Sequence, residues 1–313
     1  MRLFAVDLHV HTALSPCAAD DMTPPRIVQA ALEHGLAMIA ICDHNAAGNV
    51  PSCVAAAASL GRAATRVRKD RRRRENRQAQ PAGDATAGFE GDANGAGQAG
   101  VEATPEVPSQ RRRRPAAPHT LTVLAGMEIA TAEEVHVVGI FPNPAAASAA
   151  GAEVRRTLPD ATVAYHKKFG QQDLLDASGN ILDSELKMLG MAAGFDLAAT
   201  IDLIHRHGGL AIAAHVNRPM YSVMSQLGVF PADAGFDAIE VFCPHSDGLE
   251  PAAPDESVLR EFAGYGLPIV TSSDAHYLGD IGRCRTVVRV REPSFEELAL
   301  ALRGAGGRRV AGV

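Results

Sequence analysis

Two histidines near the start of the sequence are spaced so that they can bind one ligand together. The motif "DLHVHT" occupies residues 7–12 and places His9 and His11 one residue apart, behind the apolar run "MRLFAV". In a strand, residues i and i+2 point to the same side, so both imidazoles would converge. On a helix the same spacing would turn them roughly 200° apart. The pair is therefore a candidate metal site if the segment is a strand and further ligands join it.

Residues of metal-binding types also follow other apolar runs. "AMIAIC", "TVLAGM", "LAIAA" and "PIVTSS" have the length and composition of buried parallel strands. They are followed, in this order, by Asp43 and His44, by Glu128, by His215, and by Asp274 and His276. The carboxyl ends of the strands in a βα barrel face one mouth, so residues far apart in the sequence would meet there.

His136 stands at the beginning of its apolar run, "VHVVGI", and not at the end. Only "IATAEEV" separates it from Glu128, which is too short for a crossover helix between parallel strands. We therefore predict that these two strands form an antiparallel hairpin. Such a hairpin would return His136 to the same mouth.

Seven apolar runs, most of them separated by enough chain for a helix, favour a barrel over an open sheet. The segment 23–35, "TPPRIVQAALEHG", predicts one such helix, with Thr23 as N-cap and Gly35 at its end. The 313 residues would suffice for two average domains or for one α/β barrel, which commonly takes ~250 residues. A composition that is 46% hydrophobic but only 4% aromatic suits a core of Ala, Val, Ile and Leu.

The sequence favours a cytoplasmic protein with no membrane contact. Its N-terminus lacks a basic segment followed by a long apolar one, and no run approaches the ~18 apolar residues of a membrane span. The five cysteines are odd in number and never form CxxC, so we expect neither a disulfide framework nor a zinc knuckle. Cys17 lies close to the first histidine pair, and we expect it to be a reduced residue without a role in the site.

Residues 61–118 differ in composition from the rest of the chain. They are rich in Arg, Gly, Ala and Pro and have no sustained apolar period, which predicts a disordered insertion. Their 13 Lys and Arg against 7 Asp and Glu give a net charge of +6, so the other residues carry −12 of the total −6. A basic segment can bind nucleic acid. We favour a solvated insertion, because no aromatic residues for base stacking stand between the arginines.

Six segments taken in order resemble the PHP (polymerase and histidinol phosphatase) superfamily of metal-dependent phosphoesterases. They are "DLHVHT", "SPCAADDMTP", "AICDHN", "GMEIATAEEVH", "AAHVNRP" and "TSSDAH". The resemblance covers nearly all of the chain outside the insertion. It implies that residues 1–60 and 119–313 form a single distorted (β/α)7 TIM-like barrel, with three divalent metal ions at the mouth formed by the strand C-termini.

The resemblance also assigns ligands to each ion. The first ion would be bound by His9, His11, Glu128 and Asp274, the second by Asp20, His44 and His276, and the third by Glu128, His136 and His215. Asp21 is the alternative to Asp20. Six histidines and three carboxylates suit Zn, Mn or Fe, whereas Mg and Ca prefer oxygen ligands.

The implied activity is hydrolysis of a phosphoester through a metal-activated hydroxide. Arg218, three residues after His215, could bind a substrate phosphate through two hydrogen bonds or could form a surface ion pair. Asp7 and Asp43 could orient imidazoles or be structural. No catalytic residue beyond the metal ligands is assigned.

Three functions follow from the sequence, in decreasing order of support. The first is a phosphoesterase for a small phosphorylated metabolite or nucleotide. The second is an exonuclease or proofreading module, which the acidic body of the chain disfavours because nucleic acid is a polyanion. The third is a metal-binding module without catalysis, against which the complete ligand set argues.

Overall fold

The computed structural model describes residues 1–62, 120–244 and 253–313. Residues 1–62 and 117–313 group into one unit by their contacts. The predicted insertion, 61–118, lies almost wholly outside the described residues and stays a prediction.

Seven strands of one sheet coincide with the seven apolar runs, which confirms the α/β barrel class. Their neighbour order is β1-β2-β3-β4-β7-β8-β9. The strands are β1 (Arg2–Val10), β2 (Met38–Ile41), β3 (Thr122–Ala130), β4 (His136–Phe141), β7 (Leu210–Ala213), β8 (Ala238–Glu240) and β9 (Ile269–Val270).

One strand of the seven, β4, runs against its neighbours. It pairs antiparallel with both β3 and β7, whereas the β1·β2, β2·β3, β7·β8 and β8·β9 pairs are parallel. In the β3·β4 hairpin, Ala130 pairs with His136. The predicted hairpin is therefore confirmed, and the first residue of β4 stands beside the carboxyl end of β3.

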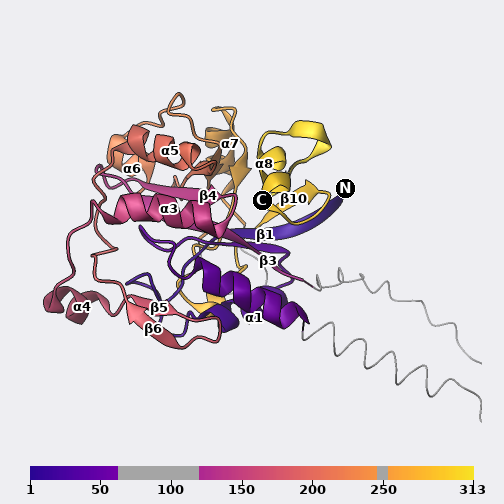
Figure 1. Cartoon of the computed structure of the whole chain (residues 1–313). Coiled ribbons are helices and arrows are strands. Elements are labelled where there is room, and N and C mark those ends of the chain that lie inside the picture. Colours follow the sequence, from indigo (N-terminus) through magenta and orange to yellow (C-terminus); the bar gives the residue numbers. More distant parts are fainter. Residues whose placement is uncertain (63–119, 245–252) are drawn as a thin grey trace, which may run out of the picture. The chain divides into compact units, whose positions relative to one another are not determined.

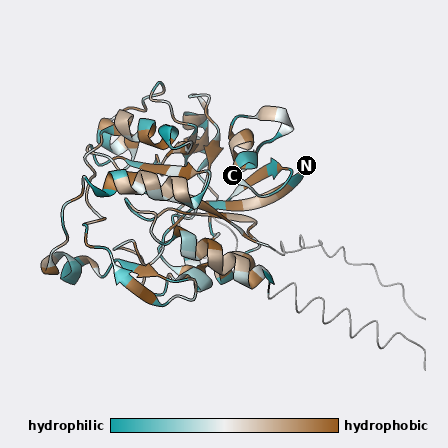
Figure 2. Cartoon of the chain, in the orientation of Figure 1, coloured by the Kyte–Doolittle hydropathy of each residue, from teal (hydrophilic) through white to brown (hydrophobic). Residues whose placement is uncertain are grey.

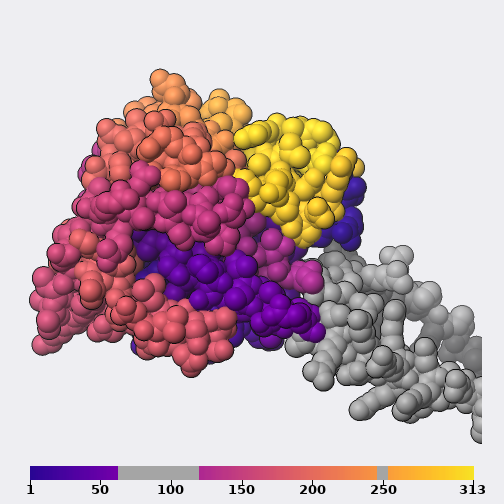
Figure 3. Space-filling view, viewed as in Figure 1, coloured from indigo at the N-terminus to yellow at the C-terminus, as the bar shows by residue number. Residues whose placement is uncertain are grey.

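The ring of strands closes at the mouth and opens at the opposite end. Beyond β9 the chain makes a parallel bridge between Ala275 and Val10, and the His11 N–H donates to the Ala275 carbonyl at 3.0 Å. The other end of β1 turns away to pair antiparallel with β10 (Thr286–Val290), which continues to β11 (Arg309–Gly312). The space-filling view shows these C-terminal residues, in yellow, against the indigo N-terminus (Figure 3). This split course of β1 is what distorts the barrel.

Asp7 holds the closure together. Its carboxylate accepts hydrogen bonds from the Ser273 hydroxyl at 2.6 Å, the Ser273 N–H at 3.0 Å and the Gly282 N–H at 2.9 Å. Burial raises the pKa of Asp7 to about 6, although these hydrogen bonds oppose the increase. Asp7 contacts no imidazole side chain, so of the two interpretations of this residue the geometry supports the structural one.

Helices cover the outer face of the strands (Figure 1). They include α1 (Pro24–Glu33), residues 50–62, α3 (Pro144–Arg155), α5 (Leu197–Arg206) and α7 (Glu256–Ala263), whereas α8 (Phe295–Leu302) packs with the apolar cluster of the opposite face. The shorter α4 (Val163–Phe169), the hairpin of β5 (Asp173–Leu175) and β6 (Ile181–Ser184), and α6 (Val223–Leu227) lie in the connections. Thr23 precedes α1 as expected, but its side chain makes no capping hydrogen bond.

Alternate residues of each strand form two separate apolar clusters. One includes Val6, Leu8, Met38 and Ala40 and takes in residues of β10 and α8. The other includes Ile39 and the apolar faces of α1, α3 and α5. This alternation is the period-two pattern of strands buried on both faces, and in Figure 2 brown, hydrophobic residues recur along the strands of the sheet.

The cysteines correct one prediction. Cys243, which follows β8, and Cys284, which precedes β10, form a disulfide across a Cα–Cα distance of 6.1 Å. The spacing of cysteines along the chain could not reveal it, because the barrel brings these two segments together. In the part of the chain that the structure describes, no helix has both the length and the apolar composition required to cross a membrane.

Candidate metal centre

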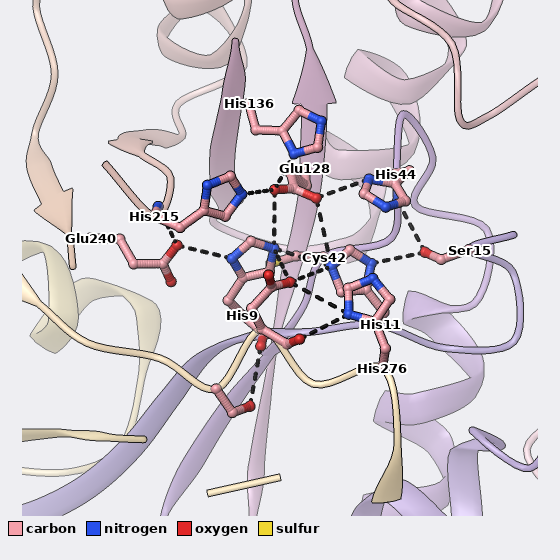
Figure 4. A network of polar contacts seen from close by, with 12 residues as sticks. His9, His11, Ser15, Cys42, His44, Glu128, His136, His215, Glu240 and His276 are labelled. Carbon is pink, nitrogen blue, oxygen red and sulfur yellow. Dashed lines mark hydrogen bonds and ion pairs between the residues drawn. The ribbon is translucent and has the colours of Figure 1, made fainter. Parts of the chain in front are cut away.

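Glu128, at the carboxyl end of β3, lies at the centre of a cluster of imidazoles (Figure 4). Its side chain is 1% exposed. Oε1 lies 2.8 Å from His136 Nδ1 and 3.0 Å from His215 Nε2. Oε2 lies 2.9 Å from His44 Nδ1. One carboxylate therefore contacts imidazoles that come from three different parts of the barrel.

Four of the predicted ligands form a compact cage. The His9 and His11 Nε2 atoms lie 3.2 Å apart, and the distances from these two atoms to Asp274 Oδ1 are 3.5 and 3.1 Å. Their distances to the nearest Glu128 oxygen are 3.4 and 3.6 Å. Ligand atoms about 2.1 Å from one ion at tetrahedral angles lie roughly 3.4 Å from each other. These distances suit ligands of one divalent ion, with His9, His11 and Glu128 as one compact group and Asp274 beside the two histidines.

Hydrogen bonds on the far sides of His9 and His11 fix their tautomers. His9 Nδ1 donates to Glu240 Oε2 at 3.0 Å. His11 Nδ1 lies 2.9 Å from Ser15 Oγ, and that hydroxyl donates its own proton to Asp43, so it accepts from the imidazole. In their neutral forms both rings therefore point a lone pair into the cage. Two lone pairs and two carboxylates facing each other require a positive charge between them.

The electrostatics of the carboxylates match this requirement. Burial acts to raise the pKa of Glu128, but the charges of His136, His9 and His44 hold it well below its usual range. Burial also acts to raise the pKa of Asp274, but the charge of His9 and the hydrogen bond from His11 hold it well below its usual range. Both groups are thus anionic, which is the state in which carboxylates bind metals.

The histidines respond to burial and to these anions in different ways. Burial, together with the charge of His276, lowers the pKa of His11 well below its usual value. Burial also acts to lower the pKa of His9, but the charges of Glu240, Glu128 and Asp274 raise this pKa well above its usual value. The cage therefore attracts a positive charge, which a metal ion can supply in place of a proton.

Two of the residues in this centre have strained backbones. His215 has a φ of 27° and Asp274 a φ of 48°, in the left-handed region that side chains other than glycine rarely adopt. Each residue follows the end of its strand. Strain of this kind persists where the surrounding structure fixes a residue for a function, and here it places both side chains in the mouth.

His44 and His276 approach a cysteine and not the predicted aspartate. Together with His11 their ring nitrogens form a group within 4.8 Å, and Cys17 Sγ lies 3.1 Å from His44 Nε2. Burial acts to raise the pKa of the Cys17 thiol, but hydrogen bonds with His276 and His44 lower it to about 6. The Cys17 thiol is therefore in contact with the cluster, at His44.

Asp20 is not brought into the cluster. Its side chain is exposed, and the Ala19 N–H that precedes it donates to the His276 carbonyl at 2.9 Å, after which the chain turns outwards. The alternative, Asp21, forms an ion pair with Arg26 at 2.9 Å.

Arg218 lies at the edge of the centre. Its Nη1 is 2.5 Å from Asp274 Oδ2, and the guanidinium stacks on the Phe242 ring at 4.0 Å. The side chain of Arg218 is 32% exposed, whereas that of Asp274 is 4% exposed. Arg218 is therefore not an isolated surface ion pair. Its guanidinium is not free for substrate alone either, because it pairs with Asp274, a predicted metal ligand.

Sequence reasoning missed Glu240 and Ser15, which orient the imidazoles. Glu240 also accepts the His215 N–H at 3.0 Å. Asp43 acts through Ser15, so of its two interpretations the one that orients an imidazole is supported. Glu240 ends β8 and could have been found by the rule that located the other residues at strand ends.

Comparisons with known proteins bear on the family of the chain. Residues 258–305 match the model of the family PHP_C, described as PHP-associated. The uncharacterized protein YqxK of Bacillus subtilis is 35% identical over 108 residues, which are 33% of this chain and 26% of that protein. The resemblance of the sequence to the PHP family is thereby confirmed.

Solved structures share the fold. The lesion-specific endonuclease PfuEndoQ from Pyrococcus furiosus aligns with a TM-score of 0.55 and 18% identity. An Endonuclease Q complex with a 27-mer duplex that carries an abasic lesion aligns with the same TM-score and 17% identity. Each alignment covers 99% of this chain but 58% of the other, so the chain spans little more than half the length of these endonucleases.

Proposed function

We propose that this PHP-like chain is a metal-dependent phosphoesterase. The observation that carries the proposal is the cage of His9, His11, Glu128 and Asp274, in which the two histidine Nε2 atoms lie 3.2 Å from each other and 3.1 to 3.6 Å from oxygens of the two carboxylates. Bound divalent ions would act as Lewis acids on a phosphoryl group and on the attacking water.

The proposed ligands form three groups. The cage binds the first ion, His44 and His276 contribute to the second, and Glu128, His136 and His215 bind the third. The donor set favours Zn, Mn or Fe. Glu128 is shared because its two oxygens face different imidazoles.

The other residues of the site position these ligands. Glu240 and Ser15 hold the His9 and His11 rings by their Nδ1 atoms, which is how outer hydrogen bonds fix the tautomer of a ligand. Arg218, packed against Phe242, presents its remaining N–H groups at the mouth, where we propose that they bind a non-bridging phosphate oxygen.

We propose a small phosphorylated metabolite or nucleotide as the substrate. The residues outside 61–118 carry a net charge of −12, which opposes close approach of a long polyanion. The fold of Endonuclease Q, which was solved with duplex DNA, makes cleavage of nucleic acid the second candidate.

A substrate screen tests the proposal. Metal-loaded protein is incubated with nucleotides, sugar phosphates and short single-stranded and duplex oligonucleotides, and released phosphate and cleaved strands are measured. We expect release of phosphate from a small substrate. Cleavage of oligonucleotides alone would select the nuclease, and no hydrolysis of any phosphoester by fully metallated protein would refute the proposal.

Replacing Arg218 by Ala tests the phosphate contact. If the guanidinium binds phosphate equally in ground and transition states, KM rises while kcat changes little. Charge-assisted hydrogen bonds contribute about 1.5 to 3 kcal/mol, so we expect a rise in KM of roughly 10- to 100-fold. Arg218→Lys should recover part of it, because an ammonium lacks the planar fork.

Steady-state kinetics are measured after the metal content of each Arg218 variant has been checked. An unchanged KM with a reduced kcat would show that Arg218 acts through Asp274 and does not bind phosphate.

A further inference from the structure

The thiol of Cys17 lies where a ligand of the second ion is needed. It is part of the loop between β1 and α1, and its Sγ is 3.1 Å from His44 Nε2. His276 lies against the same loop, and its carbonyl accepts the Ala19 N–H at 2.9 Å. His44 and His276 follow β2 and β9, and the chain segments after these strands flank β1 on its two sides.

Hydrogen bonds at Nδ1 leave Nε2 as the nitrogen of each imidazole that can bind a metal ion. His44 Nδ1 lies 2.9 Å from Glu128 Oε2, and His276 Nδ1 lies 2.8 Å from the Asp274 carbonyl oxygen. Because both acceptors lack protons, each Nδ1 is the donor and each Nε2 keeps its lone pair when the ring is neutral. The ring nitrogens of His11, His44 and His276 form an independent group of possible ligand atoms.

The loop that carries Cys17 is held in place by its backbone. The Ala18 N–H donates to the Ser15 carbonyl at 3.0 Å, and the Ala19 N–H donates to the His276 carbonyl at 2.9 Å. These bonds place Cys17 beside His276. Asp20, the residue after Ala19, points outwards and is exposed. The expected carboxylate is therefore replaced at this position by a sulfur atom.

We propose that Cys17 binds the second ion as a thiolate, together with His44 and His276. This inference rests on the proposed metal-dependent function. Three protein ligands leave one position open, as in catalytic zinc sites. The thiol proton passes to solvent when the ion binds. A thiolate with two imidazoles makes this site softer than one with a carboxylate, and it favours Zn²⁺ or Co²⁺ over Mg²⁺ or Mn²⁺.

Cobalt substitution tests the ligand without measuring activity. Metal-free protein is titrated with Co²⁺, and both the near-ultraviolet thiolate-to-cobalt charge-transfer band and the visible ligand-field bands are recorded. We expect the charge-transfer band in the parent protein and in the control variants Cys42→Ala and Cys53→Ala, which remove the other free thiols. Cys17→Ser should lose it and bind one ion fewer. Cys17→Asp should lose the band but retain the ion.

Alkylation provides a second measurement on the unmodified chain. Zn²⁺ should protect Cys17 from iodoacetamide, as followed by peptide mass, and removal of Zn²⁺ should restore the reaction. A charge-transfer band that persists in Cys17→Ser, or alkylation that is indifferent to Zn²⁺, would overturn the assignment. Visible cobalt bands without a charge-transfer band would refute the thiolate and leave the metal centre intact, whereas binding of no Co²⁺ would refute both proposals.

Discussion

Chelation is expected to abolish phosphoester hydrolysis and to release more than one divalent ion per chain. In the cage, the Nε2 atoms of His9 and His11 lie 3.1 to 3.6 Å from oxygens of Glu128 and Asp274, and without a metal ion these groups cannot activate water in the proposed way. Ions are counted by elemental analysis before and after dialysis against a chelator. Activity should return when Zn²⁺, Mn²⁺ or Fe²⁺ is added back.

Removal of the ions should also destabilise the fold. An ion that binds only the folded state contributes about 2.7 kcal/mol when present at one hundred times its dissociation constant. The thermal midpoint of the chelated protein should therefore fall and recover with metal. A carefully metallated sample that holds one ion or none would contradict the three-ion arrangement, and full activity after chelation would contradict metal dependence altogether.

Replacing Asp274 by Ala is expected to lower the rate by roughly 10³-fold, since the loss of one ligand removes several kcal/mol of transition-state stabilisation. The substitution removes an oxygen 3.1 Å from His11 Nε2 and the partner of Arg218. Both kcat and the number of bound ions should decrease, which distinguishes this variant from Arg218→Ala.

Asp202→Ala serves as the matched control for Asp274→Ala, because Asp202 is an exposed carboxylate on α5. The thermal midpoint of each variant shows whether the fold is intact. Near-normal activity in a folded Asp274→Ala protein would exclude this residue as a ligand.

The sequence predicted the barrel because its strands are continuous apolar runs and its chemistry lies at their ends. Glu128, His215 and Asp274 were all located in this way, and His136 followed from the length of one loop. These features depend on residues adjacent in the chain. A local pattern is therefore sufficient to locate a site residue that stands at the end of its own strand.

The features that the sequence left open depend on contacts between distant segments. The loop of residues 12–23 is anchored to a distant segment by the hydrogen bond from the Ala19 N–H to the His276 carbonyl, so no local pattern could decide between Asp20 and Asp21. The disulfide of Cys243 with Cys284 has the same origin. Glu240 escaped notice because the apolar residues Val241 and Phe242 follow it and extend the run.

The bridge between Val10 and Ala275 has a consequence for the order of folding. The contact between His11 and Asp274 joins residues 263 positions apart. Contacts of such long range form slowly, because a large loop must close before they contribute. A ribosome that has synthesised β1 to β8 has therefore made most of the barrel but no complete cage. The cage can be complete only once Asp274 has been synthesised, so a product truncated before this residue would lack one of the four proposed ligands.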